Sequence, residues 1–122
     1  MDRIFIGIAS VAGFLGVAAG AFGAHALKAR LDPDLMAAYQ TGVQYQLVHA
    51  VALLGVAWLT SRPDPGLSVL AGWMFTGGIV LFSFSLYALA LTGVRPLGMI
   101  TPVGGVAFLV GWGCLACTAL RP

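Results

Sequence analysis

Apolar residues are gathered into four long runs, and the polar residues fall mostly in the short gaps between them. The runs lie at approximately residues 4–26, 41–60, 67–91 and 99–120, and the helices are expected at approximately 4–26, 33–60, 67–91 and 99–120. A helix rises about 1.5 Å per residue and therefore needs about 20 residues to cross the ~30 Å hydrocarbon core of a bilayer. None of the runs alternates polar with apolar residues as membrane β-strands do, and backbone groups in lipid must be satisfied internally. The pattern predicts four transmembrane α-helices.

The gaps between the runs contain residues that start or end helices. Asp32 is a typical N-cap and Pro33 suits the first helical turn, so the second helix is expected to begin at residue 33. The proline- and glycine-containing stretches at residues 62–66 and 92–98 are expected to form tight connections. No gap is long enough to separate domains, so residues 1–122 are expected to form a single transmembrane domain. The expected fold is all-α, an integral membrane four-helix bundle of two hairpins with both termini on the same side.

The low charge content agrees with a chain surrounded by lipid. Charged residues make up 8% of the chain and hydrophobic residues 60%, whereas a soluble domain carries about 25% charged residues. The lipid bilayer is therefore the expected partner of the surface. The six basic residues are scattered and form no stripe that would neutralise phosphates, so no nucleic-acid partner is expected.

The basic residues do not fix the orientation of the chain in the membrane. We call the side that carries the two termini side A and the opposite side B. The positive-inside rule counts lysine and arginine on each side. Side A carries Arg3, Arg62 and Arg121, and side B carries Lys28, Arg30 and Arg95.

The first apolar run carries small residues at helical spacing. Ala12, Gly16, Gly20 and Ala24 fall four residues apart and therefore share one face of a helix. Small residues let two helix backbones approach closely in lipid. The stripe fits packing within the bundle, which we favour, or an interface with other subunits of a homo-oligomer or a larger membrane complex. The length of the run and this pattern favour a retained helix over a secretory signal peptide, although residues 24–26 imitate a cleavage site.

Uncharged polar residues gather in the half of the helices toward side B. On the second run, Tyr45 and His49 are four residues apart and Gln46 is three before His49, so we place them on one helical face. Polar side chains in lipid turn inward and find partners, so these residues predict an interhelical hydrogen-bond network or, as the functional alternative, a small polar pocket or proton path. The opposite half carries Trp58, Trp73 and Trp112, which predict an aromatic belt at the interface. The candidate residues are His25, Gln44, Tyr45, Gln46, His49, Ser83, Ser85, Tyr87, Thr92 and Thr101.

No residue set for catalysis or metal binding can be assembled in the membrane. His25 and His49 lie at different depths, and no carboxylate lies within a run to complete a metal site, so no metal, haem or other cofactor is expected. Cys114 and Cys117 form a C-x-x-C pattern near the end of an apolar helix, whereas redox enzymes place this pattern at a helix start. No Ser-His-Asp or paired-carboxylate arrangement is available, so no catalytic residue is named and an enzyme is not expected.

Four sequence blocks resemble one protein family. They are GAFGAHALK at residues 20–28, YQTGVQYQLVHA at 39–50, LFSFSLY at 81–87 and LGMITPVGG at 97–105. In this order they are similar to the domain-of-unknown-function 423 family, whose eukaryotic relatives are called transmembrane protein 256, and the resemblance covers nearly the whole chain. The family usually has glycine where this chain has Phe84, so a close helix crossing is not expected there. The resemblance implies a small multi-pass protein, in bacteria one of the plasma (inner) membrane. It implies no activity, and its signatures fall on the candidate residues above.

Three functions remain open from the sequence. The first, which we favour, is a structural or accessory membrane component that forms a homo-oligomer or joins a larger membrane complex. The second is a small solute carrier or channel that uses a polar pocket around His49. The third is a lipid or quinone binder, in which Tyr45, His49 and Tyr87 would hydrogen-bond a head group.

Overall fold

Four helical rods make up the part of the chain that the structure, a computed structural model, describes, which is residues 1–121. No strand occurs among these residues, and each rod is long enough and apolar enough to cross a membrane, so the predicted all-α membrane fold is confirmed. The first rod is α1 (Asp2–Phe22) with the π-helical turn η1 (Gly23–Leu27), and the second is α2 (Pro33–Thr60). The third is α3 (Ser68–Gly78), the π-helical turn η2 (Ile79–Ser83) and α4 (Phe84–Thr92), and the fourth is the 3-10 turn η3 (Arg95–Met99) with α5 (Thr101–Leu120).

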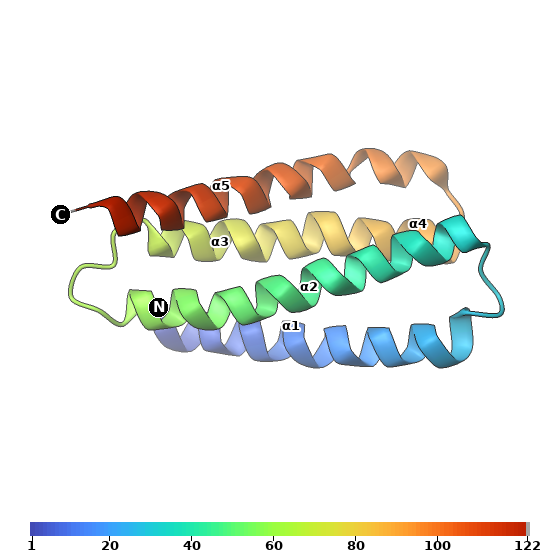
Figure 1. Ribbon diagram of the computed structural model, residues 1–122, viewed down its shortest axis with the longest axis horizontal. Helices are drawn as coiled ribbons and strands as arrows, with labels where there is room; N and C mark the ends of the chain where they lie inside the picture. The colour runs from blue at the N-terminus through green and yellow to red at the C-terminus, as the bar shows by residue number, and fades with distance from the viewer. Residues whose placement is uncertain (122) are drawn as a thin grey trace.

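The rods form two hairpins that pack side by side (Figure 1). The closest packing within each hairpin joins α1 to α2 and α3 to α5, and α2 joins the hairpins through its contacts with α3, η2 and α4. α1 begins and α5 ends at the left end of the bundle in Figure 1. We refer to this end as end A, and to the end that carries η1 and η3 as end B.

The residues between the rods end and start helices as the sequence predicts. Asp32 has an extended backbone and Pro33 opens α2. Gly93 closes α4 with a φ of 71°, in the left-handed region that favours glycine, and its N–H donates to the carbonyl of Leu89. Gly66 has a φ of 58° in the turn before α3. Backbone geometry that glycine alone adopts easily therefore sets both tight connections.

Two π-helical turns were not predicted from the sequence. A π-turn adds a residue to a helical turn and rotates the residues that follow it relative to those before it. The second one, at η2, ends at Ser83, whose hydroxyl donates to the carbonyl of Gly42 in α2 at 2.7 Å. The turn therefore brings the backbone of the third rod against α2 and α5 at the middle of the bundle.

Large rings packed on glycines form the core from end A to the middle of the bundle. The fully buried ring of Phe5 in α1 lies on Gly72 of α3, where a side-chain carbon would collide with it. The ring of Phe108 in α5 covers Gly78, and Phe75 in α3 covers Gly111 in the same way. A second, smaller cluster near end B is built around Met36, Tyr39, Val43, Leu27 and Ala90. Small residues on one rod thus receive the rings of the next and bring the rods close together.

Candidate functional site

The ten candidate residues do not form one site. Four of them are exposed on the surface of the bundle, namely His25, Gln44, Tyr45 and Thr92. Gln46, His49, Ser83 and Ser85 are buried, and Tyr87 and Thr101 are half-buried. The six interior residues divide into separate groups on different sides of α2.

The first group joins α2 to α1 and α4 through Gln46, whose side chain is only 1% exposed. Its amide nitrogen donates to the carbonyl of Ala12 in α1 at 2.8 Å, and its amide oxygen accepts from the hydroxyl of Tyr87 in α4 at 2.6 Å. Close by, the ring of Tyr39 lies 5.2 Å from that of Tyr87, and its hydroxyl donates to the carbonyl of Ala19 in α1. One amide therefore connects three helices, and both of its ends are occupied.

Short hydroxyl contacts form the second group on the third rod. The hydroxyl of Ser83 donates to the carbonyl of Gly42. Gly42 also leaves room for the ring of Tyr87, because a Cβ atom at residue 42 would lie only 2.8 Å from that ring. Ser85 and Thr101 share a hydrogen bond of 2.6 Å between their hydroxyl groups, which joins α4 to the start of α5. The bond of Ser83 thus joins the two hairpins, and the bond between Ser85 and Thr101 lies within the second hairpin.

His49 forms the third group with aromatic residues of α5. Its Nδ1 lies 2.7 Å from the carbonyl oxygen of Tyr45, and the indole N–H of Trp112 donates to its Nε2 at 3.0 Å. Its ring is stacked on Phe108 with the ring centres 3.7 Å apart. Because an indole can only donate, Nε2 must accept, and the single ring proton sits on Nδ1 and is donated to the carbonyl. Both ring nitrogens of a neutral imidazole are therefore engaged.

Two sequence-based interpretations need correction here. Gln46 does not share a face with Tyr45 and His49, because it points toward α1 while His49 faces α5. Neighbouring residues of a helix are rotated by about 100°, which separates Tyr45 from Gln46 even though both lie near His49 in sequence. Trp112 does not lie in a belt at the interface, since it bonds to His49 near the middle of α2.

The bond between Trp112 and His49 has a spectroscopic signature. Nitrogen-15 NMR of the imidazoles in detergent micelles is expected to show His49 at neutral pH as a neutral ring with the proton on Nδ1. Trp112→Phe removes the donor to Nε2, so we expect the signal of the unprotonated Nε2 to shift, while Nδ1 keeps its proton because it still donates to the carbonyl of Tyr45. The exposed His25 is an internal control and should not respond. A wild-type His49 with its proton on Nε2 would contradict this arrangement.

The small-residue stripe of α1 is used mainly inside the chain. A side-chain carbon on Gly16 would lie 2.7 Å from Leu47 of α2, and one on Gly20 would lie 3.3 Å from Val43. The carbonyl of Ala12 accepts the bond from Gln46. Ala24 alone is exposed at this face. An interface between subunits through this stripe would therefore have to displace α2.

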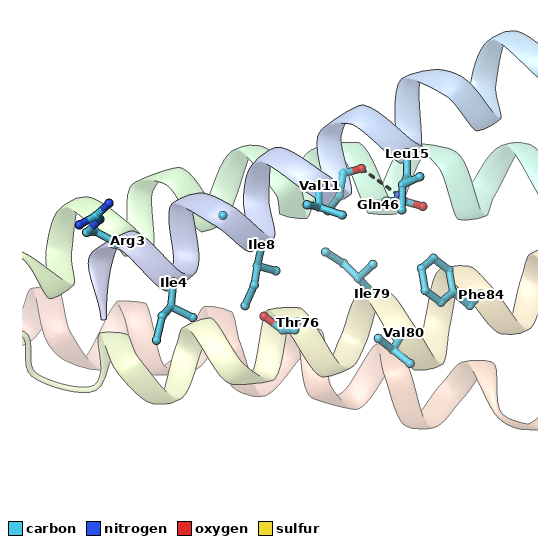
Figure 2. A pocket seen from close by; sticks show the side chains of 12 residues that line it. Arg3, Ile4, Ile8, Val11, Leu15, Gln46, Thr76, Ile79, Val80 and Phe84 are labelled. Atoms are coloured by element: carbon cyan, nitrogen blue, oxygen red, sulfur yellow. Dashed lines mark hydrogen bonds between the residues drawn. The ribbon is translucent and has the colours of Figure 1, made fainter.

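Two apolar grooves lie at the surface of the bundle, and the first of them was not predicted from the sequence. One, of about 450 Å³, lies between α1 and the third rod (Figure 2). The other, of about 580 Å³, is lined by residues of α2 and α5, among them Gln44, Tyr45, His49 and Trp112. Grooves depend on how far two rods diverge, which a hydropathy pattern does not encode. Within residues 1–121 no group of three or more His, Cys, Asp or Glu side chains is placed to hold a metal ion.

The structure has four helices long enough to cross a membrane, and no charged side chain is buried within residues 1–121. These features define a multi-pass integral membrane protein. A family model described as "Protein of unknown function (DUF423)" matches residues 19–105. The chain belongs to this family, as the four sequence blocks predicted.

Relatives from distant bacteria match the chain over nearly its full length. It is 41% identical over 120 residues to the UPF0382 membrane protein YwdK of Bacillus subtilis, covering 98% of both chains. It is 42% identical over 123 residues to the UPF0382 inner membrane protein YgdD of Escherichia coli K12, covering 98% of this chain and 92% of that one. No solved structure matches the chain. These names confirm the membrane location expected from the sequence, including the bacterial inner membrane, and neither name states an enzymatic activity.

Proposed function

We propose that the protein is a structural or accessory component of the membrane that assembles with further copies of itself or with a larger membrane complex. The occupation of the interior polar groups supports the structural part of this proposal. Among the described residues, the hydroxyl of Ser68 is the only buried polar side-chain atom without a hydrogen-bond partner. Polar groups that bond to neighbouring helices fix one packing arrangement and leave nothing in the interior to bind a passing solute.

A solute carrier or channel around His49 has less support. Coupled carriers usually keep an ionisable residue accessible within the membrane. His49 is 3% exposed, and both its nitrogens bond to groups of the same chain. Phe108 covers its face at stacking distance. Flux through this point would require these contacts to break in every transport cycle.

The hypothesis of a lipid or quinone binder also has less support. It requires Tyr45, His49 and Tyr87 to hold one head group. Tyr45 and His49 line the groove between α2 and α5. The Tyr87 hydroxyl instead donates to Gln46, on the side of α2 that faces α1. One head group cannot reach all three side chains.

Assembly is tested by measuring mass in native membrane. Two differently tagged copies are produced together at low level, the membrane is cut into native nanodiscs, and one tag is captured. We expect capture of the second tag or of a constant set of partner proteins, and a native mass above the 12.6 kDa of one chain. An unrelated four-helix membrane protein with the same tags and expression level controls for chance sharing of a disc. A mass of one chain in every disc, with no partner, would refute the proposal.

A further inference from the structure

The groove between α1 and the third rod has apolar walls along most of its length (Figure 2). Ile4, Ile8 and Val11 line the α1 side, and Ile79 and Val80 line the other. Arg3 lies at one end of the groove, at end A of the bundle, and Leu15 and Phe84 lie at the other end, near the middle of the bundle (Figure 2).

The groove exists because α1 leans on α2 and touches α3 mainly at end A. There the ring of Phe5 fills the space over Gly72 and meets Trp73 with the ring centres 5.2 Å apart. Beyond this contact the facing residue Gly7 has no side chain, and a side-chain carbon built there meets no atom within 4 Å. The two rods are therefore in contact at end A and separated where the groove runs.

The polar atoms that border the groove are already engaged. The amide of Gln46 bonds to Ala12 and Tyr87, and the hydroxyl of Thr76 donates to the carbonyl of Gly72 at 2.8 Å. The walls thus offer contact area and no free hydrogen-bonding group to a ligand. This chemistry suits a hydrocarbon chain and disfavours a polar ring such as a quinone head inside the groove.

The dimensions also identify the occupant. From Arg3 to Leu15, α1 rises about 18 Å, close to the ~15 Å depth of one leaflet's hydrocarbon. A helix with its side chains is about 10 Å wide, so a segment of this length would fill roughly 1,400 Å³. The groove holds about 450 Å³, so a helix of a partner protein could insert only some of its side chains into it.

Arg3 supplies the charge at the mouth. Its side chain is exposed, and its guanidinium forms no ion pair within residues 1–121. At end A it lies at the depth of lipid head groups, where an arginine pairs strongly with a phosphate. We propose that this groove binds one acyl chain of an anionic phospholipid from the side A leaflet, with the phosphate held by Arg3. This site does not depend on the assembly proposed above.

The test uses the full chain in vesicles of phosphatidylcholine and phosphatidylglycerol in equal amounts and with identical acyl chains. After mild extraction, native mass spectrometry counts the lipids retained by each chain. We expect wild type to retain one phospholipid per chain, with phosphatidylglycerol preferred. In Arg3→Gln, we expect that preference to fall about fivefold, because one basic residue contributes about 1 kcal/mol toward an anionic lipid surface. Arg62→Gln, on the same side and outside the groove, should keep the preference.

A second pair of variants tests the groove itself. Gly7→Leu places a side chain at the groove and should abolish retention of both lipids, while its open surroundings keep the fold intact. Gly55→Leu adds the same side chain on α2, also in open surroundings and away from the groove, and should retain lipid as wild type does. Equal retention of the two lipids by wild type, or unchanged retention in Gly7→Leu, would each overturn the proposal. Circular dichroism confirms that all four variants are folded.

Discussion

Gly104→Ala is expected to weaken the packing of α5 on the third rod. A side-chain carbon at Gly104 would collide with the backbone nitrogen of Phe82 and would lie 2.7 Å from its Cα. A flexible side chain can rotate away from such a contact, but the backbone of the π-turn η2 cannot. We expect a loss of stability of at least about 1–3 kcal/mol, the usual effect of overpacking, measured by titration with SDS from mixed micelles.

The neighbouring glycine provides the control for this prediction. Gly105→Ala adds the same methyl group one residue away, where it meets only ring carbons of Phe82 at an ordinary 3.9 Å. Alanine is a better helix former than glycine by about 1 kcal/mol, so this variant should be neutral or more stable. Equal effects of the two substitutions would mean that α5 and η2 are not in backbone contact.

The second large effect is expected from Gln46→Leu. Leucine cannot bond to the carbonyl of Ala12, and it leaves the Tyr87 hydroxyl without its acceptor in an apolar interior. Leaving a buried polar group unsatisfied costs about 1–3 kcal/mol. Single interhelical bonds in membranes contribute less on average, about 0.6 kcal/mol, because alternative partners can be found. We therefore expect a loss of about 1–3 kcal/mol for the variant as a whole, again by titration with SDS.

A double-mutant cycle separates the bond from the loss of packing. Tyr87→Phe alone should destabilise the protein less than Gln46→Leu, and the combined variant should lose less than the sum of the two. Gln44→Leu is the matched control, since Gln44 is exposed on the same helix and its change should have little effect. Strictly additive losses would show that Gln46 and Tyr87 do not interact.

The sequence predicted the elements of this fold well, because membrane thickness sets the length of each apolar run and Asp32-Pro33 marks a helix start clearly. It did not predict how each rod is rotated about its axis. The π-turn at η2 rotates Ser83 and Tyr87 toward α2, and no residue type signals such a turn. A small error in rotation placed Gln46 on the wrong face of α2.

The hydrogen bond between His49 and Trp112 could not be predicted from the sequence for a related reason. Two residues 63 positions apart meet only once the depth of both helices is known. Tryptophan is typical of the membrane interface, so its position in sequence suggested a belt. The groove between α1 and the third rod likewise depends on where two helices diverge. A pattern of hydrophobicity marks both of its walls equally as lipid-facing.

The division of the bundle into two hairpins affects the order in which the helices fold during synthesis. The bond from Gln46 to Ala12 lies wholly within the first hairpin. α1 and α2 can therefore become fixed to each other as soon as the ribosome and the insertion machinery have released them, while later residues are still being synthesised at about 5–20 per second. Tyr87 emerges afterwards and completes the second bond of the same amide. The nascent second hairpin thus meets a partner surface that is already ordered.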